Sequence, residues 1–230
     1  MSDAAHALKS RYFDRRNALL RQTAGPDRTA QGEREWRTLE TLSRLSGYAE
    51  VMQPFTGRVV DAGCGDRYLE SGAAARGFAY QGYDIDTLNF ESDAFPLEAQ
   101  SLDLFLSLAV IEHLRDPGLF LSEALRLLRP GGAVVISTPN FQQDFRNFYN
   151  DPTHVKPYTP LSLASVLKLA GFVDVQVYPG LRCKPDWYYR GKSRFWKARY
   201  LLPFRGDNRL APDWLRGRAT SMFAIGRKPL

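Results

Sequence analysis

Strand patterns alternate with helix patterns at short intervals through most of the chain. Such alternation predicts an α/β fold, in which a doubly wound, mostly parallel sheet carries helices on both faces. The strands are expected at 58–62, 78–83, 102–108, 133–137, 172–178 and 221–226. The helices are expected at 32–48, 68–76, 117–129 and 161–169.

The turn after the first predicted strand carries two glycines, Gly63 and Gly65. Glycine lets the backbone turn tightly and approach a ligand closely. Asp61 offers a carboxylate to a cationic group, or it caps the turn. Asp84 ends the next predicted strand and either accepts hydrogen bonds from ribose hydroxyls or simply ends that strand. Ligands of such sheets bind beyond the carboxyl ends of the strands, which is where these residues fall.

A glycine turn followed about 20 positions later by an acidic residue is also typical of dinucleotide sites. Here Tyr68 stands where the third glycine of that fingerprint belongs. The carboxylate of Asp61 would also repel a pyrophosphate, whereas it would attract an ammonium group. The pattern therefore favours a ligand with a cationic group.

The segment Val-Val-Asp-Ala-Gly-Cys-Gly at 59–65 resembles motif I of the class I S-adenosylmethionine-dependent methyltransferases. Four further segments follow in that family's order, and together they resemble its ubiquinone-type, small-molecule branch. They are Tyr-Asp-Ile-Asp at 83–86, the segments 92–97 and 101–105, Glu-His-Leu at 112–114, and Leu-Leu-Arg-Pro-Gly-Gly at 127–132. The resemblance runs from about Val59 to Phe172.

The resemblance implies a Rossmann-like sheet of seven strands, with an antiparallel last strand at 221–226. It also implies S-adenosylmethionine as the cofactor, held by a set of residues near the strand ends. In that set Asp61, Gly63 and Gly65 contact the aminoacyl end, Asp84 the ribose, and Asp93 with the Ala94 backbone the adenine, while Ile85 and Leu108 complete the site. Two departures stand out: Arg67 replaces a third glycine, and the six residues between Asp86 and Asp93 are too few for the usual crossover helix.

An alcohol acceptor needs a base within hydrogen-bond reach. His154 lies in the polar segment 149–158, which resembles the acceptor-side loop of methyltransferases that act on sugars and glycan intermediates. We predict that His154 is the base, with Asp151 orienting it, and that Tyr158 and Asn140 contact the acceptor. A structural, hydrogen-bonded role for His154 remains the alternative.

His113 follows the fourth strand of that family's order, here 102–108, and is either catalytic or a capping and packing residue. No metal site is predicted, because His113 and His154 lack partners at ligand spacing.

The net charge of +6 is unevenly distributed. From Leu181 onward there are 13 Lys and Arg against three Asp, whereas the first 180 residues hold 18 basic and 22 acidic side chains. A basic region on an acidic body indicates an anionic partner or surface, or else a solvated surface. Within it, residues 187–204 interleave aromatic and basic side chains, which suits a lid over the acceptor pocket, an anionic membrane surface or, less well, nucleic acid.

We interpret the chain as one methyltransferase domain with four parts. Residues 1–55 form an N-terminal helical cap, 56–180 the cofactor-binding core, 181–220 the basic and aromatic insertion, and 221–230 the last strand. Cys64 and Cys183 are too few for a disulfide scaffold and suit a reducing compartment. Neither an apolar run of about 18 residues nor a secretory signal is evident. We therefore predict a cytoplasmic protein, with peripheral attachment at the inner membrane face as an extension.

The leading functional hypothesis is O-directed methyl transfer to a small molecule, a sugar or a lipid-linked glycan intermediate. RNA or protein methylation is the second hypothesis, favoured by the basic region. Base N-methylation fits poorly, because residues 107–113 lack the Asn/Asp-Pro-Pro-aromatic turn that such enzymes use. The third hypothesis is a non-catalytic module that binds S-adenosylmethionine.

Overall fold

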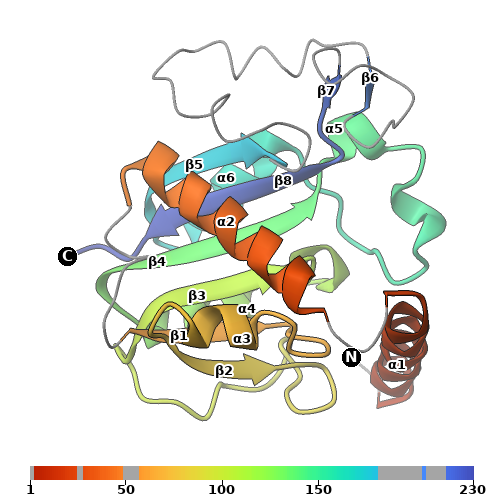
Figure 1. Cartoon of the computed structure of the whole chain (residues 1–230), viewed down its shortest axis with the longest axis horizontal. Helices are drawn as coiled ribbons and strands as arrows, with labels where there is room; N and C mark the ends of the chain where they lie inside the picture. Colours follow the sequence, from red (N-terminus) through yellow and green to blue (C-terminus); the bar gives the residue numbers. More distant parts are fainter. Residues whose placement is uncertain (1–2, 25–27, 49–56, 181–203, 206–215) are drawn as a thin grey trace.

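The computed structural model describes residues 3–24, 28–48, 57–180, 204–205 and 216–230 (Figure 1). The predicted basic and aromatic segment 187–204 lies outside these residues except for its last position, and Cys183 lies outside them as well.

The main sheet has the strand order β2-β1-β3-β4-β8-β5. Its first four strands run parallel, and β8 runs antiparallel between β4 and β5. The bounds are Arg58–Ala62 for β1, Ala79–Tyr83 for β2, Leu102–Leu108 for β3, Leu128–Pro139 for β4, Val173–Pro179 for β5 and Ser221–Arg227 for β8. A separate pair consists of β6 (Phe204–Arg205) and β7 (Arg216–Arg218). The predicted doubly wound α/β class and the antiparallel last strand are confirmed.

Seven strands were expected in the main sheet, and the described residues form six. The difference lies between β2 and β3, where residues 84–101 form turns instead of a helix and a further strand. Eighteen residues are too few for a strand flanked by two crossovers, each of which needs about a dozen residues. β2 is consequently an edge strand, and the turns after it fold back toward the carboxyl ends of the parallel strands.

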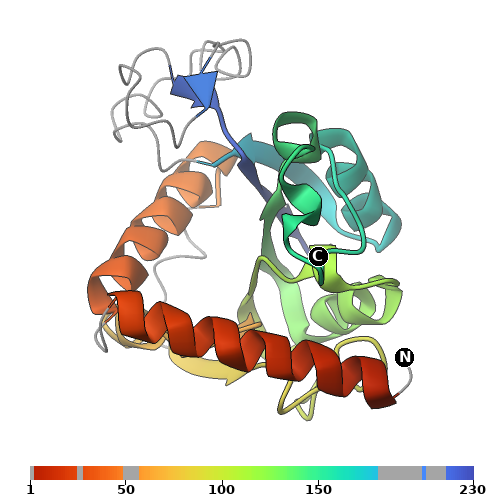
Figure 2. The same cartoon turned by 90° about the vertical axis from the view of Figure 1, so that its right-hand side faces the viewer.

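Helices cover both faces of the sheet (Figures 1 and 2). α2 and α3 lie on one face, and α4 and α6 lie on the other. Their bounds are Thr29–Ser46 for α2, Glu70–Ala74 for α3, Gly118–Leu127 for α4 and Pro160–Leu169 for α6. The short helices η2 (Ile111–His113), α5 (Phe141–Asp144) and η3 (Phe148–Asn150) lie in the connections. The long helix α1 (Asp3–Ala24) packs beside the carboxyl ends of the parallel strands (Figure 2).

Two apolar clusters hold these layers together. Between the sheet and α2, Trp36 is fully buried and its indole Nε1 donates a 2.9 Å hydrogen bond to the carbonyl of Leu69. On the opposite face, Phe105 of β3 packs edge-to-face on Phe120 of α4. Successive side chains of each strand point to opposite faces of the sheet, and helices cover both faces. Side chains are therefore buried on both sides, as expected for parallel strands between helix layers.

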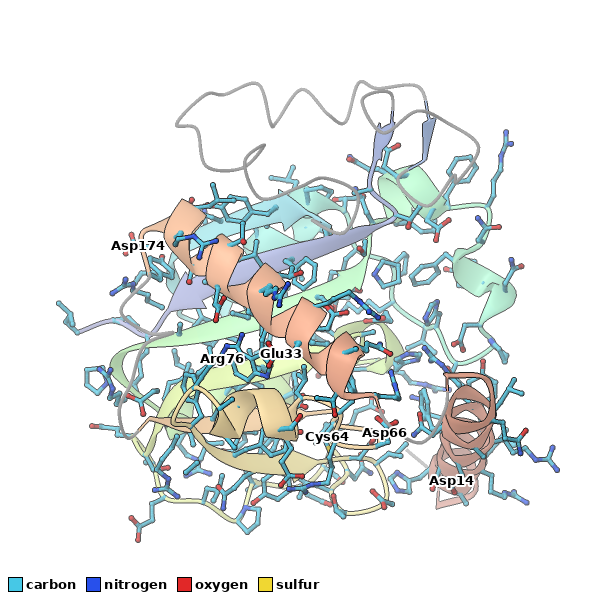
Figure 3. The ribbon with its side chains drawn as sticks, viewed as in Figure 1. Asp14, Glu33, Cys64, Asp66, Arg76 and Asp174 are labelled. Carbon is cyan, nitrogen blue, oxygen red and sulfur yellow. The ribbon has the colours of Figure 1, made fainter. Side chains whose placement is uncertain are left out.

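Arg76 ties the end of α3 to α2 at the surface of this layer (Figure 3). Its guanidinium lies 2.9 Å from the carboxylate of Glu33 and 2.6 Å from that of Glu40. The predicted helices and strands agree with the observed ones within a few residues at most ends. In the part of the chain that the structure describes, no helix is long and apolar enough to cross a membrane.

Candidate cofactor and acceptor site

A cavity of about 550 Å³ opens at the carboxyl ends of the parallel strands. Its wall combines residues that follow β1, β2, β3 and β4 with side chains from α1, and its volume falls in the range of small-molecule sites. Members of this wall from the strand ends include Gly63, Gly65, Asp84, Ile85, Leu108, His113 and Thr138. The cavity therefore lies where ligands bind in doubly wound sheets.

The glycine turn after β1 forms one side of the cavity. Gly63 has a φ of +89°, and a Cβ built on it would lie 2.2 Å from Cγ2 of Val110. The backbone nitrogens of Gly63 and Cys64 donate to the carbonyl of Tyr83, at 2.7 and 3.1 Å. Figure 3 shows Cys64 and Asp66 of this turn between the start of α2 and α1. Only glycine fits at position 63, and the turn is tied to the end of β2.

Asp84 lies next to the same turn at the end of β2. One carboxylate oxygen accepts a 2.7 Å hydrogen bond from the Gly65 nitrogen, and the other accepts one of 2.7 Å from its neighbour Ile85. Burial raises the pKa of Asp84 above its ordinary value. A carboxylate has about four lone-pair sites, so each oxygen can still accept a bond from a ligand hydroxyl in the cavity.

Asp61 lies deeper, behind the turn. Its side chain is buried, and one oxygen accepts a 2.7 Å hydrogen bond from the hydroxyl of Tyr80. The other oxygen, Oδ1, has no hydrogen-bond partner among the residues described here. Burial raises the pKa of Asp61 to about 7. Asp61 is not among the described residues that line the cavity, so it lies behind the wall as a buried carboxylate with spare capacity for a cationic or hydrogen-bonding group.

The residues predicted to hold an adenine are elsewhere. Asp93 and Ala94 are exposed and do not belong to the cavity wall. The carboxylate of Asp93 instead accepts hydrogen bonds from the Asn89 nitrogen and the Ser92 hydroxyl, at 3.0 and 2.8 Å. Leu88, Asn89, Phe90 and Glu91, four residues of the same turn region, line the cavity in their place.

Of the predicted catalytic residues, His113 reaches the cavity and His154 lies behind it, with ring centroids 4.8 Å apart. Asp151 is 3.9 Å from Nε2 of His154, too far for a hydrogen bond. Its carboxylate instead accepts a 2.9 Å hydrogen bond from the Thr153 nitrogen and lies 3.4 Å from the Arg16 guanidinium.

The predicted acceptor residues Tyr158 and Asn140 form a β-bridge with each other. Both are buried, and neither belongs to the cavity wall as the described residues form it. Their neighbour Pro139 lines the cavity instead.

Glu112 completes a buried polar cluster with the two histidines. One of its oxygens, Oε2, accepts a 3.0 Å hydrogen bond from the hydroxyl of Thr138 at the end of β4. Burial raises the pKa of Glu112 to about 7 and lowers that of His113 to about 4. The sequence placed Glu112 beside His113, but the contacts to Thr138 and His154 depend on segments that only the fold brings together.

Helix α1 supplies site residues that the sequence did not single out. The ammonium of Lys9 donates a 2.6 Å hydrogen bond to the carbonyl of His113 and lies 3.8 Å from the Glu91 carboxylate. The ring of Phe13 packs edge-to-face on the His113 imidazole. Residues 1–55 were predicted as a helical cap, and nothing in their spacing marked these side chains as part of a cavity. The basic residues of this helix, Lys9, Arg11, Arg15 and Arg16, are a signal that sequence reasoning could have used, because Lys9 and Arg16 contact acidic side chains at the site.

Comparison with known proteins places this geometry in a family. A family model described as a methyltransferase domain matches residues 10–177. A protein of Mycolicibacterium smegmatis described as a probable S-adenosylmethionine-dependent methyltransferase is 33% identical over 145 residues, which are 54% of this chain and 56% of that protein. The ubiquinone biosynthesis O-methyltransferase of Caulobacter vibrioides is 30% identical over 122 residues, which are 44% and 48% of the two chains. The chain thus spans about half the length of these curated relatives.

Solved structures share the fold. A methyltransferase from Archaeoglobus fulgidus, described as S-adenosylmethionine-dependent, superposes with a TM-score of 0.55 at 24% identity, over 84% of this chain and 94% of that one. Phosphoethanolamine N-methyltransferase 2 of Haemonchus contortus, solved with S-adenosyl-L-methionine, superposes with a TM-score of 0.52 at 20% identity, over 84% and 52%. The family model covers most of the chain, including the glycine turn and the acidic ends of β1 and β2. This chain therefore belongs to the methyltransferase-domain family, and the resemblance to class I methyltransferases is confirmed.

Proposed function

We propose that the chain binds S-adenosylmethionine in the cavity at the strand ends and transfers its methyl group to a hydroxyl of a small-molecule acceptor, such as a sugar or a lipid-linked glycan intermediate. The observation that carries the cofactor part is the pairing of Asp84 with the glycine turn at Gly65 on the cavity wall. The acceptor part draws on the cavity size and on the name of the O-methyltransferase relative.

The residues present fit this cofactor. Asp84 has lone pairs left for ribose hydroxyls, and the absence of a side chain at Gly63 and Gly65 allows the backbone to approach the ligand. The buried Oδ1 of Asp61 suits the ammonium group of the aminoacyl end. Ile85 and Leu108 supply apolar surface, and Leu88 and Phe90 replace Asp93 and Ala94 as the wall available to an adenine ring.

When bound, S-adenosylmethionine supplies an electrophilic methyl group on a sulfonium sulfur. Transfer would form a C–O bond to the acceptor as the C–S bond breaks, with the electron pair of the C–S bond staying on sulfur, and the hydroxyl proton would pass to Nε2 of His113, which has no hydrogen-bond partner among the described residues. The chain's contribution is mainly to hold the acceptor in line with that methyl group, which is worth up to about 7–11 kcal/mol. We place the acceptor hydroxyl at the end of the cavity formed by His113 and Thr138. His154 and Asp151, which do not line the cavity among the described residues, would then act by positioning His113.

Tritiated methyl donor incubated with the purified chain and fractionated lysate tests the acceptor class. Label in lipid or polysaccharide, or in a small organic molecule, is the expected result. Label in RNA or protein would contradict the proposed small-molecule acceptor and indicate a macromolecular one. Binding of the cofactor without any label would leave the chain as a binding module. A melting assay with S-adenosylhomocysteine tests the cofactor separately, since ligand at 100 times its Kd stabilises a protein by about 2.7 kcal/mol.

The predicted peripheral attachment of a cytoplasmic protein to an anionic membrane is a separate part of the proposal. It rests on the aromatic and basic composition of residues 187–204. Each basic residue near such a surface contributes roughly 1 kcal/mol. Flotation with vesicles that contain anionic lipid, but not with neutral vesicles, is the expected result, and failure to float with either would remove it.

A further inference from the structure

Three side chains that suit a metal ion converge beside the cavity. Glu112 and His113 come from η2, and His154 comes from the loop after η3. Each offers one ligand atom, and these three atoms lie within 4.8 Å of one another. Two imidazoles and one carboxylate are a donor set that binds zinc and other first-row divalent cations.

The hydrogen bonds around the cluster fix which atoms carry lone pairs. Nδ1 of His113 lies 3.1 Å from the Thr153 carbonyl, and Nδ1 of His154 lies 2.6 Å from the Phe148 carbonyl. The Thr153 hydroxyl also lies 3.0 Å from Nδ1 of His113, but it donates its proton to the Asp151 carboxylate and can only accept from this nitrogen. Because a carbonyl too only accepts hydrogen bonds, each Nδ1 carries the proton and each Nε2 is left with a lone pair. This is the arrangement that orients a histidine for metal binding through Nε2.

The Glu112 carboxylate is also held by a hydrogen bond at one atom and has lone pairs available at the other. The Thr138 hydroxyl donates to Oε2 of Glu112, which leaves Oε1 without a hydrogen-bond partner among the described residues. Nε2 of His113 also lacks a partner in this part of the chain. Glu112 has no exposed surface and His113 is 5% exposed. Buried polar atoms without partners are uncommon, and here two of them lie in one cluster.

We propose that Glu112, His113 and His154 bind a first-row divalent cation such as Zn²⁺. In a tetrahedral site with bonds of about 2.1 Å, the ligand atoms lie about 3.4 Å apart, so the widest separation, up to 4.8 Å, has to close by up to about 1.4 Å. Of the three ligands only His113 is among the described residues that line the cavity, and we place the open coordination position on that side.

The cation would deepen the proposed function, and this part of the inference rests on that function. An acceptor hydroxyl that occupies the open position loses its proton more easily, because a bound cation lowers the pKa of an oxygen ligand. The ion, rather than a free imidazole, would then activate the acceptor. His154, which the sequence predicted as the base, would act as a ligand from behind His113.

The test uses Co²⁺ and Zn²⁺ with the purified full chain, after removal of metals by a chelator. We expect one ion per chain by calorimetry and visible absorption bands of Co²⁺ in a site of low coordination number. Loss of a ligand in His154→Ala is expected to weaken binding by more than about 100-fold, because even second-shell changes weaken metal sites by 10–100-fold. His6→Ala, which alters the chain's remaining histidine, is the matched control and should bind normally.

Glu112→Gln keeps the shape of the side chain and serves if His154→Ala does not fold, as judged by circular dichroism. Absence of Co²⁺ bands in the unmodified chain, or equal binding by His154→Ala and His6→Ala, would overturn the metal site. Methyl transfer that persists in excess chelator would also overturn the role of the ion while leaving the proposed function intact. Metal binding without methyl transfer to any fraction would instead count against the proposed function.

Discussion

The Asp84 carboxylate accepts a hydrogen bond of 2.7 Å from the backbone nitrogen of Gly65. This bond joins the end of β2 to the turn after β1, so the two strand ends form one wall of the cavity. The same carboxylate is proposed to hold the cofactor ribose. The position of the Asp84 carboxylate therefore depends on the glycine turn, and the position of the turn depends on this carboxylate.

Asp84→Asn should weaken binding of S-adenosylhomocysteine by roughly 10- to 100-fold. The amide has one acceptor oxygen, so either Gly65 or Ile85 loses its acceptor, and the bonds to ribose lose their charge. Hydrogen bonds to charged groups contribute about 1.5–3 kcal/mol, and 1.4 kcal/mol is a factor of ten. Calorimetric titration measures the change. Asp86→Asn is the matched control, because Asp86 is exposed and does not line the cavity. Equal affinity in the two variants would contradict the ribose assignment.

The stability and affinity of the chain should respond to pH through Asp61. Burial raises the pKa of this carboxyl to about 7 in the folded state, whereas the unfolded chain loses the proton near its ordinary value of 3.8. The folded state therefore holds the Asp61 proton between these values, and the contribution of Asp61 to stability falls as pH rises from about 4 to about 7. The neighbours that act on it are the Tyr80 hydroxyl, Asp84 and Arg67. Asp61→Asn should flatten this part of the pH profile in a melting series.

A cation beside Asp61 stabilises the ionised form, so cofactor binding should have the opposite pH dependence. Affinity for S-adenosylhomocysteine is expected to rise as pH increases toward about 7, with release of a proton on binding below that value. Calorimetry in two buffers of different ionisation enthalpy measures the proton. Affinity that is independent of pH in this range would remove Asp61 from the aminoacyl contact.

The sequence was informative where local pattern and spacing suffice. Strands with buried side chains on both faces appear as apolar runs, and the acidic residues that end β1 and β2 therefore lie where they were predicted. The loop after β2 was harder. Asp93 was predicted to hold the adenine, but a loop this short closes on itself, and the Asp93 carboxylate accepts hydrogen bonds from the Asn89 nitrogen and the Ser92 hydroxyl instead.

Contacts between distant segments were not predictable in this way. Thr138 bonds to Glu112 across 26 positions, and Thr153 meets His113 across 40. The order of these groups around the cavity follows from how the loops after β3 and β4 pack, which no periodicity reveals. His154 was consequently identified as a functional candidate, but its place behind His113 was not.

Gly63→Ala should lower the melting temperature and abolish most cofactor binding. An L-residue at positive φ is strained by about 1–2 kcal/mol, and the new Cβ would also meet Val110 at 2.2 Å. A loss of 1 kcal/mol lowers Tm by about 2–4 °C in a domain of this size, so a drop of at least about 4 °C is expected. Gly47→Ala is the control, since Gly47 has a φ of +82° and nothing within 4 Å of the added Cβ. Equal decreases in Tm in the two variants would mean that Val110 moves away from the new Cβ at no measurable cost in stability.

Lys9 should hold α1 against the site, because its ammonium bonds to the His113 carbonyl and faces the Glu91 carboxylate. Lys9→Met keeps most of the apolar stem and removes both contacts. Amide exchange across 3–24 is expected to accelerate by about 10- to 100-fold, as for the loss of charged hydrogen bonds, and the affinity for S-adenosylhomocysteine should fall with it.

Arg11→Met is the matched variant for α1. Arg11 is exposed, its guanidinium bonds to Ala7 within the helix, and its replacement removes the same charge from the same helix. Exchange across 3–24 should therefore stay close to that of the unmodified chain. If both variants accelerate exchange equally, net charge on α1 matters more than the contact at Lys9. If neither does, α1 is held by its apolar contacts, such as Phe13 on His113, because these are the contacts that both substitutions leave in place.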